Sequence, residues 1–210
     1  MDTEALIRWA AASMDARFTP PAYDAACAAT TLRHAGRSAE PHGRFLQRWN
    51  GAYALDGALH VFGALHEPPN QSLDLWNLPS GWRQGFGIVL EGLWFFAEDA
   101  FGNQFAYRDE KVVRLRIHDA RVEPVAPDFV GWLEAVLLDP QRWLALDVFN
   151  ACVRTHGPLP PGGHFGLKPG AEASRTMRPD ALEVLPARDN LELRAASWTF
   201  GTTRSAPRAR

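Results

Sequence analysis

The sequence has few lysines, no excess of positive charge and no long apolar run. Of its 22 basic residues only Lys111 and Lys168 are lysines, and the formal net charge is −2. A dedicated nucleic-acid-binding domain is normally clearly basic, so this balance argues against nucleic acid as a partner. No stretch approaches the roughly 18 consecutive apolar residues that a membrane-spanning helix requires, so no membrane partner is expected.

Cysteine is also scarce. Cys27 and Cys152 lie far apart in the chain and indicate neither a disulfide framework nor a metal clip. The first four residues include two acidic ones, Asp2 and Glu4, and no basic one, whereas a secretory signal begins with basic residues. We therefore expect a cytoplasmic protein that stays reduced.

The composition is that of an ordinary globular domain. Hydrophobic residues make up 46% of the 210 positions and charged residues 22%. This length suits one good-sized domain or two very small ones. Neither disorder nor a fibrous structure fits these proportions.

The periodicity of the apolar residues changes three times along the chain. Helical spacing predicts helices over residues 3–18, 22–34 and 44–49, and again over 128–138 and 140–152. Between and after them, apolar runs and alternation predict strands over residues 58–64, 88–97, 104–108, 113–117, 121–125, 181–185 and 191–198. Residues 80–87 and 157–170, which are rich in glycine and proline, are predicted to be loops.

This order of elements predicts an α+β fold. N-terminal helices precede a mostly antiparallel sheet of about five to seven strands, and C-terminal helices and a possible edge hairpin follow it. The last ten residues, 201–210, are polar and are expected to form a flexible tail.

The near-neutral net charge conceals an uneven distribution. Residues 50–110 hold eight acidic residues and two arginines, a net charge of −6, while the flanking segments are slightly basic. A run of like charges usually forms a solvated face. The alternative is an acidic surface that attracts a basic partner.

Most signatures of catalysis are absent. The sequence has no Gly-x-Ser-x-Gly elbow and no Gly-rich phosphate loop followed by lysine. The seven histidines form no His-x-x-x-His pair. No metal, cofactor or catalytic residue is therefore predicted.

Glu98 and Asp99 form the best carboxylate pair. Adjacent residues of a strand point to opposite faces, so the two would not share a substrate unless the turn rotates them. A structural turn, part of an interaction surface, and a small hydrolase that uses Asp99 with a histidine such as His60 remain open. A histidine within hydrogen-bond reach of Asp99 would favour the hydrolase.

Tryptophan is abundant, with eight residues in the chain. Those in predicted strands and helices are expected to fill the core. Trp76 and Trp82 lie in predicted loops, where a core role and a role as exposed interface anchors are equally open.

Several short motifs occur in an order that resembles the SUKH superfamily. They are Phe45-Leu46-x-x-Trp49-Asn50-Gly51, then Leu59-x-Val61-Phe62-Gly63, then Leu93-Trp94-Phe95-Phe96-Ala97-x-Asp99-x-x-Gly102-Asn103-x-Phe105, and a helix beginning Phe129-Val130-x-Trp132-Leu133. The superfamily contains Syd, fungal cell-wall assembly regulators and many bacterial immunity proteins. The resemblance spans about residues 22–138 and implies a SUKH-like domain over 1–156, with residues 157–200 as an extension packed on it.

The resemblance implies a binding protein that is not an enzyme. Bacterial relatives of this kind block a toxin, often a nuclease, and an acidic inhibitor suits a basic nuclease surface. A regulatory scaffold with a cellular client is the alternative. We expect the partner-binding residues to be those that are acidic, lie in predicted loops, or both. They are Asp56, Glu67, Asp74, Trp76, Trp82, Glu98 and Asp99.

Overall fold

The computed structural model describes residues 17–18, 33, 36, 40–64, 72–168 and 178–204. The helices predicted over 3–18 and 22–34 lie almost wholly outside this part of the chain, as do Glu67 and residues 205–210. The exception at the end of the first helix is Arg17–Phe18, which forms strand β1.

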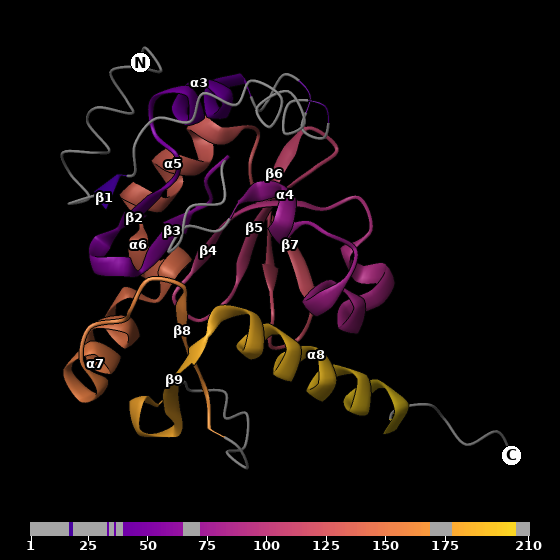
Figure 1. Cartoon of the computed structure of the whole chain (residues 1–210), viewed down its shortest axis with the longest axis vertical. Coiled ribbons are helices and arrows are strands. Elements are labelled where there is room, and N and C mark those ends of the chain that lie inside the picture. The colour runs from indigo at the N-terminus through magenta and orange to yellow at the C-terminus, as the bar shows by residue number, and fades with distance from the viewer. Residues whose placement is uncertain are drawn as a thin grey trace, which may run out of the picture.

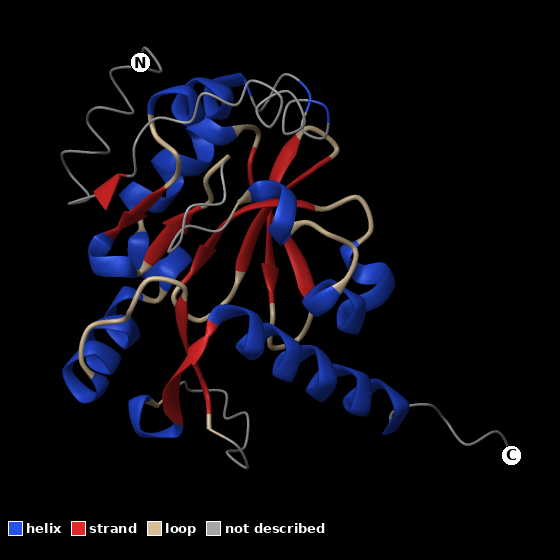
Figure 2. Ribbon diagram, in the orientation of Figure 1, coloured by secondary structure: helices blue, strands red, loops and turns tan. Residues whose placement is uncertain are grey.

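The described part of the chain forms the predicted α+β fold around a seven-stranded sheet (Figure 1, Figure 2). Every strand pairs antiparallel with its neighbours in the sequence, in the order β1 to β7. After β1 the strands are β2 (Ala52–Ala54), β3 (Leu59–Val61), β4 (Trp94–Asp99), β5 (Gln104–Arg108), β6 (Lys111–Arg116) and β7 (Arg121–Ala126). The sheet confirms the prediction of five to seven mostly antiparallel strands.

Helices cover both faces of the sheet. Phe95 of β4 packs against Trp82, while the next residue, Phe96, packs edge-on against Trp132. Adjacent strand residues point to opposite faces, so Trp82 and Trp132 lie on opposite sides. The helical elements are α3 (Glu40–Arg48), η2 (Leu55–Gly57), α4 (Leu73–Trp76), η3 (Gly81–Leu90), α5 (Phe129–Leu138), α6 (Pro140–Leu144), α7 (Leu146–His156), η4 (Pro179–Ala181) and α8 (Ala187–Arg204).

The segment before β4 corrects two predictions. Residues 81–90 form η3 and not a loop, and β4 begins at Trp94, six residues later than expected. Trp82, Phe86 and Leu90 are buried at a spacing of four. Gly87, with φ of +58°, interrupts the helical backbone within this segment.

The C-terminal region corrects three more. Residues 163–167 form strand β8 inside the predicted loop, and β8 pairs with β9 (Leu182–Pro186). The predicted strand over 191–198 is part of helix α8, which continues into the expected tail as far as Arg204. The buried positions of α8, Leu191 and Ala195, are four residues apart, which is helical spacing.

The residues beyond 156 contact the sheet directly. The backbone N–H of Phe165 in β8 donates to the carbonyl oxygen of Ala100 at 2.8 Å. Phe165 is fully buried and packs against Phe101 and Phe149. No helix in the described ranges has both the length and the apolar character needed to cross a membrane.

Candidate functional site

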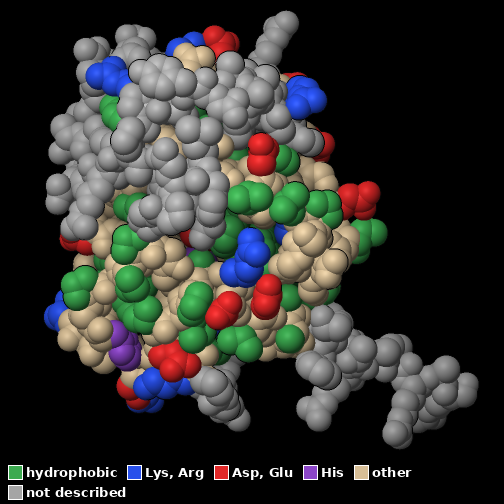
Figure 3. Space-filling model, in the orientation of Figure 1, with side chains coloured by type: hydrophobic (Ala, Val, Ile, Leu, Met, Phe, Trp, Pro, Cys, Tyr) green, Lys and Arg blue, Asp and Glu red, His purple; other side chains and the backbone are tan. Residues whose placement is uncertain are grey.

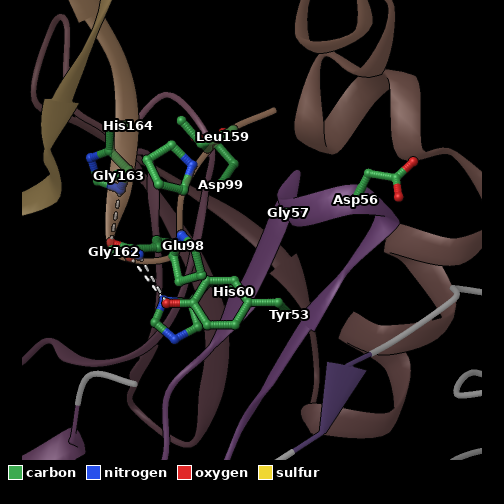
Figure 4. Close-up of a pocket in the computed structure, with 13 residues that line it drawn as sticks. Tyr53, Asp56, Gly57, His60, Glu98, Asp99, Leu159, Gly162, Gly163 and His164 are labelled. Carbon is green, nitrogen blue, oxygen red and sulfur yellow. Dashed lines mark hydrogen bonds and ion pairs between the residues drawn. The ribbon is translucent and has the colours of Figure 1, made fainter. Parts of the chain in front are cut away.

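Three of the predicted partner-binding residues meet at one pocket, which we call the Glu98 pocket (Figure 4). It encloses about 70 Å³ at the ends of β3 and β4. Its walls come from distant parts of the chain: Tyr53, Asp56, Gly57, His60, Glu98, Asp99, Ala100 and residues 159–164.

The sheet register places His60, Glu98 and Gln104 in one row. Glu98 stands directly opposite His60 of β3 and opposite Gln104 of β5. A β-bulge between Phe95 and Ala97 shifts the alternation by one residue, so that Glu98 shares a face with Phe95 and Gln104. Cross-strand neighbours on one face lie close enough to bond.

Glu98 is the centre of a buried polar network, and only 2% of its own surface is exposed. Its Oε1 lies 3.0 Å from Nδ1 of His60, and its Oε2 accepts from Nε2 of Gln104 at 2.9 Å. Nε2 of His164, on β8, lies 3.2 Å from Oε2. Gln104 in turn accepts from Nε1 of Trp76 at 2.8 Å. The network therefore ties the sheet to α4 and to the C-terminal hairpin.

Both imidazoles turn one ring nitrogen towards Glu98. Nδ2 of Asn190 donates to the carbonyl oxygen of Phe101 at 3.1 Å and lies 3.3 Å from Nδ1 of His164, while Nε2 of that ring faces Glu98. His60 faces the same carboxylate through Nδ1.

The pKa of Glu98 reflects opposing influences. Burial alone would raise it, but attraction to the charge of His164 and hydrogen bonds from His164 and His60 lower it to about 2. Glu98 is consequently ionised near neutral pH.

Asp99 has a structural role in the β4–β5 turn. Its Oδ1 accepts from the backbone N–H groups of Phe101 and Asn103, each at 2.9 Å. Its Oδ2 accepts from Nδ2 of Asn103 at 2.6 Å and from Nη2 of Arg114 at 3.0 Å. Four bonds to one carboxylate support the turn interpretation of Asp99.

The hydrolase interpretation paired the wrong carboxylate with His60. His60 bonds Glu98, and the described bonds of Asp99 go to backbone, Asn103 and Arg114. Among the described residues that line the pocket, none carries an aliphatic hydroxyl or a thiol. The pocket walls therefore offer no serine, threonine or cysteine nucleophile.

Asp56 lies at the exposed rim of the pocket. Figure 4 shows its carboxylate pointing away from Glu98 and from both histidines. Its φ of +56° belongs to the left-handed region, which Asp tolerates better than most residues. Across the pocket, the hydroxyl oxygen of Tyr53 accepts from the backbone N–H of Gly162 at 3.1 Å, and the Tyr53 ring stacks on His60.

Trp76 and Trp82 are buried, so neither is an exposed anchor. They expose 1% and 2% of their surfaces and pack against each other, and Trp82 donates Nε1 to the carbonyl oxygen of Trp76. Glu98 and Asp99 are equally buried, so they too lie out of reach of a flat partner surface. Trp76 and Trp82 lie in α4 and η3, whose inner sides are strongly apolar. Their predicted position in loops was therefore a poor guide to their exposure.

A second feature surrounds Asp74, which is exposed. Leu75, Leu78 and Ile88 expose 41%, 45% and 80% of their surfaces, and Glu91 is exposed nearby in the sequence. Figure 3 shows hydrophobic side chains gathered over α4 and η3 with acidic side chains beside them. We call these five residues the α4–η3 surface.

The acidic character of residues 50–110 is reduced at the surface. Of the eight acidic residues, five are exposed, namely Asp56, Asp74, Glu91, Asp109 and Glu110. Glu98 and Asp99 are buried and bonded, and Glu67 lies outside the described part. Set against the partly exposed Arg83 and Arg108, the exposed acids leave a net charge of −3 on the described residues of this segment.

Sequence reasoning missed Tyr53, Gly162 and His164. His164 lies in a segment dense in glycine and proline, where no periodicity marks it. Over the described ranges, no group of three or more His, Cys, Asp or Glu side chains has an arrangement that could hold a metal ion. The histidines of the pocket are directed at Glu98 instead.

Comparison with known proteins supports the fold. No family model matches the chain, and no curated protein matches it either. The crystal structure of Atu4351 from Agrobacterium tumefaciens is similar, with a TM-score of 0.59 and 14% sequence identity over 84% of this chain and 82% of that one. At this level of identity the likeness shows that the two chains share a fold.

Proposed function

We propose that this chain is a non-catalytic protein-binding domain of SUKH type. In this proposal it is a bacterial immunity protein that neutralises a toxin domain by binding its basic surface. The observation that carries the proposal is the α4–η3 surface, where exposed apolar and acidic side chains lie within one short segment. The ordered SUKH-like motifs support it independently.

The apolar part of this surface suits a protein interface. Scattered exposed leucines are normal, but a group of large aliphatic side chains rimmed by polar residues marks an interaction site. Ile88 exposes 80% of its surface. Full burial of such a side chain contributes about 1.5–3 kcal/mol.

The charged part indicates the kind of partner. Asp74 and Glu91 flank the exposed aliphatic residues, and the described part of the segment carries a net charge of −3 at its surface. Acidic side chains around an apolar centre favour a partner whose surface is basic, as a nucleic-acid-cleaving toxin is. Such charges chiefly accelerate association and set specificity.

The α4–η3 surface gives a direct test with a matched control. Ile88 and Leu138 are both 80% exposed, but Leu138 lies at the end of α5. The chain is co-expressed with a candidate toxin domain from its native host, and cell survival and the Kd of the purified pair are measured. We expect Ile88→Ser to weaken binding at least tenfold and to abolish protection, and Leu138→Ser to change neither.

Charge is tested separately. Asp74→Lys should slow association, and the difference from the unaltered chain should shrink at high salt because salt screens exposed charges.

Equal effects of Ile88→Ser and Leu138→Ser would refute the surface assignment. Tight binding to a cellular protein, without any protection against the toxin, would instead support the regulatory scaffold.

A further inference from the structure

A short turn at the end of η3 carries the most exposed part of the α4–η3 surface. This segment, residues 87–92, is called the 87–92 turn, and it begins and ends with a glycine of positive φ. A Cβ on Gly87 or on Gly92 would meet no atom within 4 Å, so neither glycine is packed on that side. Glycine also leaves the backbone free to adopt other conformations. Other contacts must therefore hold Ile88 and Glu91 in one position.

The guanidinium group of Arg83 spans the end of this turn. Nη2 donates to the carbonyl oxygen of Leu90 at 3.2 Å, and Nη1 and Nη2 both donate to that of Leu93, at 3.3 and 3.2 Å. Nη1 also donates to Oδ1 of Asn77 at 3.2 Å, so the same group reaches the end of α4. The side chain of Leu90 is buried and anchors the turn from the inside. Arg83 thus joins η3, α4 and the segment that leads into β4.

Asn77 gives Arg83 a fixed support. Asn77 pairs with Phe95 of β4 as a neighbouring strand would, because its Nδ2 donates to the Phe95 carbonyl oxygen at 2.7 Å and its Oδ1 accepts from the Phe95 N–H at 2.8 Å. The centre of the Phe95 ring lies 5.0 Å from the guanidinium carbon of Arg83. The 87–92 turn is therefore held against the sheet itself.

The acceptors of Arg83 explain why an arginine stands at this position. All of its hydrogen bonds in the described chain go to neutral oxygen atoms, so no ion pair accounts for it. A planar fork reaches three oxygens in fixed directions, whereas the donors of lysine all lie on one nitrogen. Partial burial lowers the pKa of Arg83, but a guanidinium stays charged at any pH of interest.

We propose that Arg83 is a positioning residue for partner binding, which holds the 87–92 turn so that Ile88 and Glu91 meet the partner in one conformation. That a partner binds there rests on the function proposed above. Arg83 acts through the turn, and the partner contacts the turn. If a loosened turn kept the binding conformation for only about one-tenth of the time, the Kd would rise about tenfold.

The first measurement uses the unaltered chain and needs no partner. ¹⁵N relaxation gives the order parameters of the Arg83 Nε–H and of the backbone N–H groups of Ile88 and Glu91. We expect values of about 0.85, typical of rigid groups, and a value below about 0.6 for the Arg108 Nε–H. Arg108 is the matched comparison because it bonds the same turn only once, with 3.5 Å between Nη2 and the carbonyl oxygen of Glu91.

The second measurement compares Arg83→Lys with Arg108→Lys. Both variants keep the charge and remove the planar fork. In Arg83→Lys the backbone order parameters of residues 88–91 should fall below about 0.6, and in Arg108→Lys they should not change. With a candidate toxin domain from the native host, Arg83→Lys should raise the Kd about tenfold, chiefly through slower association, because fewer molecules are ready to bind. Urea unfolding of both variants identifies any loss of the fold.

Each result decides one point. An Arg83 side chain as mobile as that of Arg108, or equal effects of the two lysine variants, overturns the role of Arg83, and the first of these holds even if Arg83→Lys does not fold. A loosened turn with an unchanged Kd overturns positioning and leaves the proposed function intact. A Kd raised chiefly by faster dissociation overturns it as well, since Arg83 would then contact the partner. An unaltered chain with a rigid Arg83 that binds no toxin refutes the proposed function, while Arg83 still fixes the turn.

Discussion

Asp99 and Glu123 allow the contribution of one buried carboxylate to be measured against an exposed one. Both lie near Arg114: Oδ2 of Asp99 is 3.0 Å from Nη2, and Oε1 of Glu123 is 3.7 Å from Nη1. The Asp99 side chain is fully buried, whereas that of Glu123 is 28% exposed. The perturbations compared are therefore Asp99→Asn and Glu123→Gln.

Asparagine at position 99 preserves one side of the network and breaks the other. Its carbonyl oxygen still accepts from the two backbone N–H groups, but its amide then faces two donors, Nδ2 of Asn103 and Nη2 of Arg114. A hydrogen bond to a charged group contributes about 1.5–3 kcal/mol, and breaking a buried ion pair costs about 3–5 kcal/mol. Because Arg114 keeps Glu123 nearby, we expect a loss of about 3 kcal/mol.

The expected loss for Glu123→Gln is below about 1 kcal/mol, as for other exposed pairs. Unfolding in urea, followed by tryptophan fluorescence, measures both. With a dependence on urea of about 2 kcal/mol per molar, Asp99→Asn should lower the midpoint by about 1.5 M. Losses that agree to within about 1 kcal/mol would show that burial of the Asp99 network contributes no extra stability.

Three further predictions concern stability. Since the folded pKa of Glu98 is lowered to about 2 from 4.5, its contribution is full above pH 4.5 and is lost as the pH falls towards 2. The urea midpoint should therefore fall over that range, and fall less in Glu98→Gln; parallel curves would contradict this. Trp76→Phe removes the 2.8 Å bond to Gln104 and should cost about 1–3 kcal/mol, seen as a lower melting temperature. Gly51→Ala should destabilise more than Gly81→Ala by about 2 kcal/mol in urea unfolding, because both have positive φ but only at Gly51 does a Cβ come within 2.6 Å of a backbone oxygen; equal losses would mean that φ alone decides.

The sequence predicts those parts of the fold that depend on local pattern. Strands β5, β6 and β7 were expected within two residues of their observed ends, because Val113 and Leu115 alternate with partly exposed arginines. The sequence also predicts the helix after Asp128, because aspartate is a favoured N-cap residue. In the structure the Asp128 side chain does accept from the backbone N–H of Gly131.

What the sequence hides depends on residues distant in the chain. The Glu98–Asp99 pair was recognised, but its accessibility was not, because burial follows from His164 and α4 packing around it. The burial of Trp82 was signalled by its spacing of four from Phe86, yet the glycines of that segment favoured a loop. In α8, Leu191 and Ala195 carry the same signal, although the apolar run over residues 191–198 also suits the strand of an edge hairpin.

The way His164 and Asn190 close the Glu98 pocket has a consequence for the order of folding. Four of the six pairings in the seven-stranded sheet, β2–β3 and those from β4 to β7, join strands that are only a few residues apart, and such short-range contacts form quickly. By contrast, Asn190 reaches the carbonyl oxygen of Phe101 across 89 positions. During synthesis, which proceeds from the N-terminus, the sheet can assemble while β8 and α8 are still missing. The Glu98 pocket is then completed only after residues 159–164, which form one of its walls, and Asn190 have emerged.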